Sequence, residues 1–583
     1  MTTTPSRPCR RLLLTAALAL CGLAHAAEPV QLRLIGINDF HGNLESTGLS
    51  LTLADPSGGD KPVKVPVGGA AALAGLVKAL RAAAPNSLMI SGGDLIGAAP
   101  LVSTLFRHES TIDVMNAIGL DVSTVGNHEF DAGATELMRI ARGGCGANAA
   151  DAVATSCTLA PYTGTRFQYL SANVVDAAGR TLLPASVIKT VQGIRVGIIG
   201  AVTRTTPSIV IPSGVAGLRF TDEADAINAG VTSLKAQGAQ AVVVLIHQGI
   251  HTGGVQDPNG CDKPTGDLQP VLARLDPRVD LIVSGHTHWA YVCEFARNGE
   301  GPLLFTSAGL YGKLVTDITL SIDPVQGRVV SSKAHNVIVQ SEAYTGASGP
   351  VALTDAYPRF EPAPDVAQFI ARYVAGAKAS AAQVIGHLSG PATKGANAES
   401  PTGGALGHLI ADAQLAATRS AGAQVALMNP FGIRAPLVPS ADGQNDGAVT
   451  FGNVFQVQPF ANRLTTLSLS GAELKAVLEQ GLDDSGSKQW LSPSAGFAYR
   501  YDMARAPGDR IVAMALDGAA TDPAKRYRVT VNNFLAQGGD GFSVFAKGAD
   551  AALGMTDLQA LEAWIKVVPL RTVPGEKREQ PAG

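Results

Sequence analysis

Five short apolar segments of this chain each end beside a residue that can bind a metal ion, and this pattern limits the possible folds most strongly. The segments are rich in Val, Ile and Leu, as expected for strands of a buried parallel sheet. They cover residues 30–37, 87–90, 120–125, 241–246 and 280–284. Stretches of helical character at 68–81, 112–118 and 222–237 lie between them. The alternation predicts an α/β fold whose polar residues meet at the carboxyl ends of the strands.

The polar residues that follow these segments have spacings that suit metal binding. Asp39 and His41 are two residues apart, so in an extended chain their side chains point to the same side. The pair His286 and His288 repeats this spacing. Taken alone, Asp39 and His41 would be interpreted as a polar turn with a surface histidine. Together the segments supply seven nitrogen and oxygen ligands, namely Asp39, His41, Asp94, Asn127, His247, His286 and His288.

Seven such ligands fit two divalent cations that share one carboxylate, that of Asp94. Paired cations lie about 3.5–4 Å apart and hold the attacking and leaving oxygens of a displacement at phosphorus. The set contains no cysteine, which disfavours a structural zinc site. Imidazole and carboxylate ligands together favour Mn, Zn, Co or Fe over Ca, and Mg remains a further candidate.

The segment Gly126–Asp131 adds catalytic side chains to one of these ligands. Asn127 supplies a neutral oxygen, and His128 supplies an imidazole that can hold or release a proton near neutral pH. Asp131 follows three residues later, so its carboxylate can fix the tautomer of His128. We therefore predict that His128 and Asp131 are the catalytic residues.

Residues 1–26 are predicted to be a targeting segment rather than part of the fold. Arginines precede an apolar stretch, Leu12–Leu23, that is too short to span a bilayer, and Ala24-His25-Ala26 is typical of a cleavage site. The chain is therefore expected to be exported, to the periplasm or to the medium. A twin-arginine signal or a lipobox ending at Cys21 fits the local sequence less well. No other stretch is long and apolar enough to predict a membrane helix.

Four cysteines follow this segment, and an exported protein can keep disulfides. Cys145 and Cys157 flank a loop rich in Gly and Ala, so a bridge between them closes easily. Cys261 and Cys293 then pair by elimination, and free thiols are the alternative. A zinc site is disfavoured because no C-x-x-C motif occurs.

The blocks of polar residues resemble those of the calcineurin-like metallophosphoesterases. That family has D-x-H, G-D, G-N-H-[ED], a lone His and G-H-x-H in this order, and all of them occur between about residues 30 and 310. The resemblance implies a double β-sheet sandwich flanked by helices. It also implies that His128 and Asp131 form the catalytic dyad. It divides the ligands between two metals, one held by Asp39, His41, Asp94 and His288 and the other by Asp94, Asn127, His247 and His286.

A helix is predicted beyond this region, at residues 365–377, because apolar residues recur there at i, i+3, i+4, i+7 and i+8. Prolines precede it, and we interpret it as a helix that links two domains. A helix that belongs wholly to one domain is equally compatible with the pattern. The predicted domains are a leader at 1–26, a metallophosphoesterase domain at 27–350, a linker at 351–380 and a substrate-binding α/β domain at 381–575.

Three loops of the second domain contain side chains suited to binding a nucleotide. Arg434 can hold an anion through two parallel hydrogen bonds. Phe460 and Phe534 could stack on a flat base, although a single Phe is more often part of a core. Asn462 and Asp540 could form hydrogen bonds to the edge of the base or to a ribose.

These loops resemble the C-terminal domain of the exported 5′-nucleotidases. The patterns of that family are N-G-G-G-I-R, Q-P-F-G-N and N-F-L-A-x-G-G-D-G-F, and the resemblance covers nearly the whole chain after the leader. It implies that two aromatic rings stack on the base. The substrate contacts that it implies are Asn429, Arg434, Phe460, Asn462, Phe534 and Asp540.

The second domain departs from the family pattern at several positions. Pro430 and Phe431 replace two glycines, which stiffens and crowds that loop, and Ala461 replaces another glycine. Lys394 lies in a segment where the family carries an arginine, so phosphate binding from this side is expected to be weaker. Residues 401–405 resemble a small insertion. These differences concern the choice of substrate rather than the hydrolysis.

The leading functional prediction is an exported enzyme that removes phosphate from 5′-nucleotides. A hydroxide activated by two metal ions would attack phosphorus, with help from His128 and Asp131. The first alternative is a related hydrolase of nucleotide sugars, 2′,3′-cyclic nucleotides or a non-nucleotide phosphoester. The second is a non-catalytic binding protein that keeps the metals, and no lost ligand favours it. Charged residues make up 16% of the chain with a net charge of −3, so binding of nucleic acid polymers is not indicated.

Overall fold

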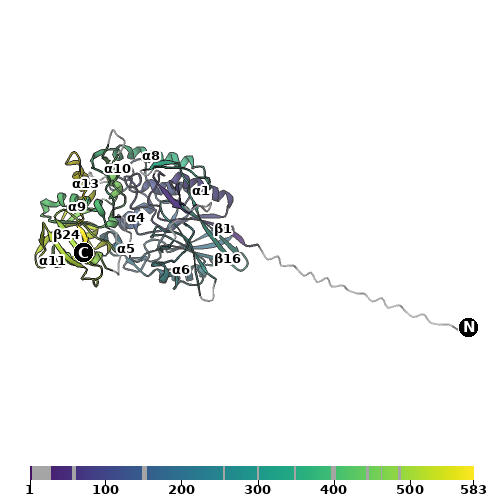
Figure 1. The fold of residues 1–583 in the computed structure, drawn as a ribbon. Coiled ribbons are helices and arrows are strands. Elements are labelled where there is room, and N and C mark those ends of the chain that lie inside the picture. Colours follow the sequence, from purple (N-terminus) through teal and green to yellow (C-terminus); the bar gives the residue numbers. More distant parts are fainter. Residues whose placement is uncertain are drawn as a thin grey trace.

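The computed structural model describes residues 1–2, 28–46, 48–55, 61–147, 154–253, 257–297, 301–346, 349–395, 402–440, 446–460, 462–483 and 488–582. The predicted leader lies outside the described residues apart from its first two. So do Ala461 and residues 396–401, which carry part of the departures from the family pattern. The described chain forms an N-terminal and a C-terminal half that lie side by side (Figure 1).

The N-terminal half is built on two six-stranded sheets. The first contains, in spatial order, β16 (Arg328–Ile338), β15 (Leu314–Asp323), β1 (Val30–Ile37), β4 (Ser87–Ser91), β5 (Val122–Thr124) and β6 (Gln168–Leu170). The second contains β13 (Ala290–Phe295), β14 (Leu303–Ala308), β12 (Leu281–Ser284), β11 (Ala241–His247), β9 (Ile194–Val202) and β8 (Ser186–Val191). Strands β1, β4, β5 and β6 are parallel, as are β9, β11, β12 and β14. The carboxyl ends of the parallel strands therefore gather at one edge of each sheet.

The two sheets pack face to face, and the core between them takes apolar side chains from both. Leu34 and Ile90 of the first sheet and Val196 and Val243 of the second are fully buried in this shared core. All residues of β11 are buried, as expected for a central parallel strand. The double β-sheet sandwich and the α/β class are thus confirmed.

Helices cover the outer face of each sheet. Helices α1 (Ala70–Ala83), α3 (Glu109–Ile118) and α4 (Gly133–Arg142) share a buried cluster with Ile35 and Met89 of the first sheet. Helices α6 (Glu223–Ala236) and α7 (Leu268–Leu272) pack on the second sheet, and α1 and α6 lie on opposite sides of this half (Figure 1). Helix α1 begins after the position predicted for it because Gly68 and Gly69 have φ angles of 87° and 84°.

The predicted helix at 365–377 lies within α8 (Pro364–Ala381). Its buried face, Val366, Ile370, Tyr373 and Ala377, joins the cluster formed by α1 and α3. The ring of Tyr373 meets that of Phe106 at a centroid distance of 4.8 Å. The far end of α8 contacts α10 (Phe451–Val457) of the C-terminal half. The helix therefore rests on the first half and reaches the second.

The C-terminal half contains a mixed five-stranded sheet with helices on both faces. In spatial order the strands are β23 (Ser492–Pro493), β20 (Val425–Met428), β27 (Arg526–Asn532), β22 (Arg463–Ser470) and β28 (Ala549–Thr556). Helices α9 (Gly404–Thr418) and α13 (Asp557–Lys566) pack with α10 in one cluster, and α11 (Gly471–Gly481) packs in another. A four-stranded sheet follows the order β26 (Ala519–Ala520), β25 (Ile511–Leu516), β24 (Phe497–Tyr501) and β29 (Glu579–Pro581).

Short elements complete the described chain. Two-stranded ribbons pair β2 (Ser50–Leu53) with β3 (Val63–Pro66), β7 (Val174–Val175) with β10 (Arg219–Phe220), β17 (Tyr344–Gly346) with β18 (Gly349–Val351), and β19 (Val384–His387) with β21 (Ala448–Thr450). The short helices are α2 (Leu101–Thr104), η1 (His128–Phe130), α5 (Thr206–Ile209), η2 (Pro212–Val215), η3 (Arg419–Ala421), η4 (Pro430–Gly432), α12 (Asn533–Ala536), η5 (Gly539–Gly541) and η6 (Ser543–Lys547). Leu101 of α2 is buried in the core of the C-terminal half, so the two halves share an apolar contact.

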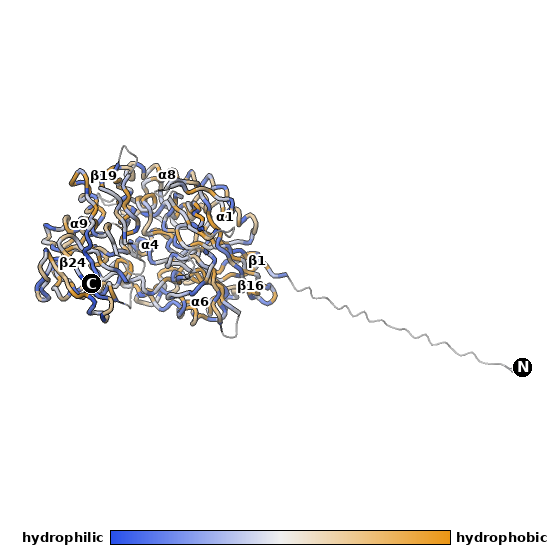
Figure 2. Tube along the Cα trace, viewed as in Figure 1, coloured by the Kyte–Doolittle hydropathy of each residue, from blue (hydrophilic) through white to orange (hydrophobic). Residues whose placement is uncertain are grey.

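No helix among the described residues is long and apolar enough to cross a membrane. Hydrophobic and hydrophilic residues are interspersed along the chain in both halves (Figure 2).

Both predicted disulfides are present. Cys145 pairs with Cys157 across a sequence separation of 12, and Cys261 pairs with Cys293 across 32. The second bridge joins the loop after β11 to β13, so it links two segments that flank candidate metal ligands.

A thiol titration tests these bridges. We expect protein lacking residues 1–26 to show no free thiol when it is denatured without reductant, because all four remaining cysteines are paired. After reduction the same titration should find the four thiols. Four free thiols before reduction would contradict both bridges.

Candidate active site

The structure brings the seven predicted ligands together at the carboxyl ends of the parallel strands. Asp39 and His41 follow β1, Asp94 follows β4 and Asn127 follows β5, while His247 ends β11. These five side chains are almost completely buried. His286 and His288 follow β12 and are partly buried.

One group of ligands consists of Asp39, His41 and His288, whose ligand atoms all lie within 4.8 Å of one another. Nε2 of His288 is 3.4 Å from Oδ1 of Asp39 and 3.2 Å from Nε2 of His41. Oδ2 of Asp94 lies 3.6 Å from Nε2 of His41, so this carboxylate borders the group.

A second group lies on the other side of Asp94. The same Oδ2 atom of Asp94 is 3.0 Å from Nε2 of His247. Oδ1 of Asn127 lies 3.1 Å from Nε2 of His247 and 3.0 Å from Nδ1 of His286. The carboxylate of Asp94 thus occupies the position between the two groups that a shared ligand requires.

The outer hydrogen bonds of His41 and His247 suit metal binding. Nδ1 of His41 donates to the carbonyl oxygen of Gly97 at 2.9 Å, and Nδ1 of His247 donates to that of Gly92 at 2.8 Å. These bonds direct each Nε2 into the site, as outer hydrogen bonds do for metal-bound histidines. Burial lowers the pKa of His41 to about 3, so its imidazole is neutral and keeps a lone pair.

His286 and His247 differ in charge. Burial lowers the pKa of His286 to about 3, and the neighbouring imidazolium of His247 adds to this effect. Burial alone would also lower the pKa of His247, but the carboxylate of Asp94 outweighs it and raises that pKa to about 9. Two buried carboxylates therefore attract positive charge to the centre of the site, and the donor set fits divalent cations.

Backbone strain is concentrated on the same ligands. The φ angles are positive at Asp39 (48°), His41 (48°), Asp94 (52°), His286 (76°) and His288 (63°). A non-glycine residue in this region costs on the order of 1–3 kcal/mol and persists only where the surrounding structure imposes it. The strain turns five ligands inward from the strand ends, which is typical of a functional site.

His128 and Asp131 form a hydrogen-bonded pair beside this site. Nδ1 of His128 lies 2.8 Å from Oδ2 of Asp131, and the ring of His128 is 5.1 Å from that of His41. Burial alone would lower the pKa of His128, but the carboxylates of Asp131 and Asp94 outweigh it and raise the pKa above its ordinary value. The ligand atoms of His41, Asp94 and His128 also lie within 4.8 Å of one another, so His128 reaches the edge of the candidate metal site.

Several residues of the site were not predicted from the sequence. The amide of Asn38 donates to Oδ2 of Asp39 at 2.7 Å and to the carbonyl oxygen of Gly309 at 2.6 Å, which holds the carboxylate in place. Its position beside Asp39 was the only available signal. The ring of Tyr311 lies 5.9 Å from that of His41, and nothing in the local sequence indicated this contact. Glu129, next to His128, is buried behind the site.

Two predicted substrate residues of the C-terminal half lie against the predicted dyad. The ring of Phe460 is stacked on that of His128, with a centroid distance of 6.1 Å and an interplanar angle of 16°. The guanidinium carbon of Arg434 is 5.9 Å from the centroid of Phe460. An aromatic ring and a cation from the second half therefore border the metal site of the first.

The other predicted substrate residues lie nearby in the fold of the second half. Nδ2 of Asn429 donates to Oδ2 of Asp540 at 2.7 Å, while Oδ1 of Asn429 is buried without a protein partner. The amide of Gln489, which was not predicted, donates to the same oxygen of Asp540 at 3.0 Å. Phe534 packs on Gly539 and against the core of this half, and Asn462 is buried near the start of β22.

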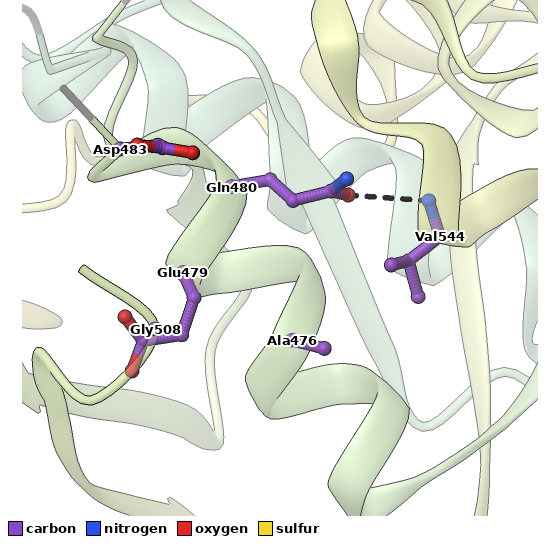
Figure 3. Close-up of a pocket in the computed structure, with 6 residues that line it drawn as sticks. All are labelled: Ala476, Glu479, Gln480, Asp483, Gly508 and Val544. Carbon is purple, nitrogen blue, oxygen red and sulfur yellow. Dashed lines mark hydrogen bonds between the residues drawn. The ribbon is translucent and has the colours of Figure 1, made fainter. Parts of the chain in front are cut away.

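The substituted loop has its own contacts. Nζ of Lys394 donates to the carbonyl oxygen of Pro430 at 3.4 Å, and the backbone N–H of Phe431 donates to Gln489 at 3.2 Å. The side chain of Phe431 is 41% exposed. The cavity drawn in Figure 3, lined by Ala476, Glu479, Gln480, Asp483, Gly508 and Val544, contains none of the candidate site residues.

The sandwich fold and its ligand set define a calcineurin-like phosphoesterase domain, and comparison with known proteins agrees. The family model "Calcineurin-like phosphoesterase" matches residues 32–290. The model "5′-nucleotidase, C-terminal domain" matches residues 384–547. The chain therefore belongs to the 5′-nucleotidase family that combines these two domains.

Individual relatives cover both halves. Endonuclease YhcR of Bacillus subtilis (strain 168) is 30% identical over 542 residues, which is 92% of this chain and 40% of that protein. This chain thus spans less than half the length of that relative. A probable 5′-nucleotidase of Treponema pallidum (strain Nichols) is 28% identical over 594 residues, which is 91% of this chain and 90% of that protein. The crystal structure of a 5′-nucleotidase precursor from Thermus thermophilus is 26% identical with a TM-score of 0.71, over 95% of this chain and 99% of that chain.

Proposed function

We propose that this chain is a metal-dependent phosphohydrolase that removes the phosphate from 5′-nucleotides. The observation that supports this most is the contact between the halves, where Phe460 stacks on His128 and Arg434 lies beside the ring of Phe460. A ring able to stack on a base and a cation able to hold phosphate thus lie next to the proposed catalytic group. The similarity to a 5′-nucleotidase precursor extends over both halves.

In this proposal the carboxylate of Asp94 would be a ligand for both of two divalent cations, of Mn, Zn, Co or Mg. When bound, such cations supply stabilisation of phosphoryl charge and a nucleophile at neutral pH. The ligands of one cation would be Asp39, His41, Asp94 and His288, and those of the other Asp94, Asn127, His247 and His286. The positive φ angles and the outer hydrogen bonds keep these side chains in place before any substrate arrives.

His128 would act on the phosphoryl group itself. Burial alone would lower its pKa, but the carboxylates of Asp131 and Asp94 outweigh burial and raise that pKa, which favours the protonated imidazole. It can therefore donate a hydrogen bond to an equatorial oxygen or a proton to the departing oxygen. Asp131 occupies Nδ1, which leaves Nε2 for the substrate.

The C-terminal half would bind the nucleotide. Arg434 would pair with phosphate oxygens, and the unpartnered Oδ1 of Asn429 would accept a hydrogen bond from the substrate. Phe460 and Phe534 would stack on the base, while Asn462 and Asp540 would hold the nucleoside. The catalytic unit would comprise residues 27–350, the linker 351–380 and the substrate-binding unit 381–575.

The proposed place of action is outside the cytoplasm, in the periplasm or the medium. The two disulfides support this, because such bridges persist in oxidising compartments. Residues 1–26 would direct the export.

A related hydrolase with a bulkier or cyclic substrate is the second candidate. The loop at Pro430 favours it in one respect, because Phe431 presents an exposed ring where the family pattern has glycine. Lys394 in place of an arginine would also bind phosphate as a point charge rather than through two parallel hydrogen bonds. Nucleotide sugars and 2′,3′-cyclic nucleotides are the substrates to compare with 5′-nucleotides.

Truncation of either stacking ring tests the proposed role of the second half. We expect Phe460→Ala or Phe534→Ala to weaken nucleotide binding by about 1–3 kcal/mol, the usual contribution of a base–aromatic stack. The Michaelis constant for a nucleotide should then rise about 5- to 150-fold where it follows binding. Turnover of a small aryl phosphate, which needs only the metals and His128, should change far less. The measurement is the ratio of nucleotide to aryl phosphate turnover at low substrate concentration.

Phe545→Ala is the matched control, because this ring is fully buried in the core of the same half. It should lower the melting temperature and depress both substrates together. If the Phe460 and Phe534 variants behave in the same way, with an unchanged ratio, the second half does not bind a base and the non-nucleotide alternative gains support.

A further inference from the structure

Glu129 is a buried carboxylate beside the candidate site, and it has no role in the proposed mechanism. It follows His128 directly, lies within the short helix η1 and is 3% exposed. Among the described residues its oxygens meet backbone N–H groups of the strand-end loops rather than an Arg or Lys side chain. A buried carboxyl group without a cationic partner needs several hydrogen bonds, and the donors of these bonds show which segments the group connects.

The two oxygens of Glu129 accept three backbone hydrogen bonds from two different loops. The N–H groups of Asp94 and Leu95, after β4, donate at 3.0 and 2.9 Å. The N–H of Gly126, after β5, donates at 2.5 Å. One side chain therefore joins the ends of two adjacent parallel strands.

The hydroxyl of Tyr169 adds a contact from a third strand. It belongs to β6, the next strand of the same sheet, and donates to Oε1 of Glu129 at 3.3 Å. Since β4, β5 and β6 are neighbours in the sheet, the carboxylate is anchored along the row of strand ends that supplies Asp94 and Asn127.

The loops that Glu129 joins are in close contact at the shared ligand. A Cβ atom on Gly126 would lie 2.1 Å from Oδ1 of Asp94, so only glycine allows this approach. The same Oδ1 accepts a hydrogen bond from the backbone N–H of His128 at 2.9 Å. The backbone of Asp94 is thus held by Glu129, and its side chain is held by the residue next to Glu129.

We propose that Glu129 is a positioning residue that fixes the shared metal ligand Asp94 and the catalytic His128 relative to each other. Glu129 is not one of the seven candidate metal ligands. It acts through the three backbone N–H groups that donate to it. One of these belongs to Asp94, so Glu129 also helps to hold the strained backbone of Asp94, whose φ angle is 52°. The inference rests on the metal site of the proposed function, but not on the identity of the substrate.

The chemistry of this position requires a carboxylate. Both of its oxygens face backbone N–H groups, which can only donate, so both oxygens must accept. The amide of glutamine has almost the same shape but turns an NH2 group toward at least one of these donors. Glu129→Gln therefore removes an acceptor while it preserves volume, and it should release one of the two loops.

The test is the affinity of Glu129→Gln for Mn²⁺, measured by calorimetry on the full chain without substrate. Loss of an outer contact of a metal ligand typically weakens metal binding about 10- to 100-fold, and we expect a rise of this size in the dissociation constant. For an aryl phosphate, kcat should fall while the Michaelis constant at saturating Mn²⁺ changes little. Raising Mn²⁺ should restore part of the lost turnover, which a merely structural defect would not allow.

Glu479→Gln is the matched control. Glu479 is also buried, and its carboxylate also accepts successive backbone N–H groups, those of Arg510 at 3.0 Å and Ile511 at 2.6 Å. It extends from α11 toward Gly508 in the C-terminal half (Figure 3). This variant should lose thermal stability and keep the affinity of the wild type for Mn²⁺.

Tyr169→Phe serves as a milder second variant if Glu129→Gln does not fold, because it removes only the hydroxyl that anchors Glu129. It should raise the Mn²⁺ dissociation constant in the same direction by a smaller factor. Unchanged Mn²⁺ affinity in the folded variants, with only a lower melting temperature as in Glu479→Gln, overturns the proposal. If wild-type protein binds Mn²⁺ but does not hydrolyse nucleotides, the shift in metal affinity still tests Glu129 and only the proposed substrate fails.

Discussion

Replacing Asp94 by Asn is expected to lower the turnover of any phosphoester by about three orders of magnitude or more. The carboxylate lies between the two ligand groups, 3.6 Å from Nε2 of His41 and 3.0 Å from Nε2 of His247, so both cations would lose a charged ligand. Metal ions contribute several kcal/mol to the stabilisation of charge in such transition states, and about 4 kcal/mol corresponds to a thousandfold change in rate. Phosphate release with added Mn²⁺ and the metal content of the purified protein are the measurements.

Asp121→Asn is the control for this variant. Asp121 precedes β5 at the opposite end of the strand, where it accepts hydrogen bonds from Met89 at 2.8 Å and Arg81 at 3.0 Å. Its replacement should change stability but not metal content. Exhaustive chelation of the wild type should reproduce the loss seen in Asp94→Asn, and full turnover after chelation would show that the seven side chains do not form a catalytic metal site.

The second large effect is expected for His128→Ala, which should slow turnover about 10²- to 10⁴-fold, the usual contribution of a positioned acid or base. Asp131→Asn should act in the same direction, because it removes the negative charge beside Nδ1 of His128 and can turn an NH2 group toward that nitrogen, which changes the tautomer. The measurement is kcat for two aryl phosphates with leaving groups of high and low pKa. A greater loss for the poorer leaving group would indicate proton donation, and equal losses would indicate stabilisation of equatorial charge.

Metal content separates this role from metal binding, since the ligand atoms of His128, His41 and Asp94 lie within 4.8 Å of one another. His128→Ala should keep the metals of the wild type. If it loses one of them together with its activity, His128 is a ligand, and the assignment to the dyad is wrong.

The candidate site of the N-terminal half could be predicted because its residues stand next to the strands in the sequence. Each candidate ligand ends an apolar strand or lies within a few residues after it, as Asp39 follows β1 and His247 ends β11. Parallel strands bring their carboxyl ends to one edge of the sheet. The spacing of His286 and His288 gave the same signal. The α/β fold class followed from the same pattern, whereas the two-sheet sandwich was implied by the family resemblance and the disulfides by the short loop between Cys145 and Cys157 and by elimination.

What could not be predicted depends on contacts between distant segments. The sequence places an acidic residue at 129, but only the fold shows that it accepts hydrogen bonds from Leu95 and Gly126. Tyr311 reaches the ring of His41 from a turn after β14 that carries no motif. The stacking of Phe460 on His128 arises from the way the two halves pack, which no periodicity within either half encodes.

Element ends were the least predictable part of the fold. Helix α8 extends beyond the predicted 365–377 at both ends. Its apolar spacing marked the buried face correctly, through Val366, Ile370 and Tyr373. The additional turn at its C-terminal end, up to Ala381, lies against Gly452 of α10.

Phosphate release from a 5′-nucleotide and from its 3′ isomer, by the same metal-loaded protein, tests the central proposal most directly. With Mn²⁺ or Co²⁺ added, the account predicts rapid release from the 5′-nucleotide, little from the 3′ isomer and none from either after chelation. The reason is that a base held by the second half would place only the 5′-phosphate between Asp94 and His128. Equal release from the two isomers, or release from an aryl phosphate but from no nucleotide, would contradict the account.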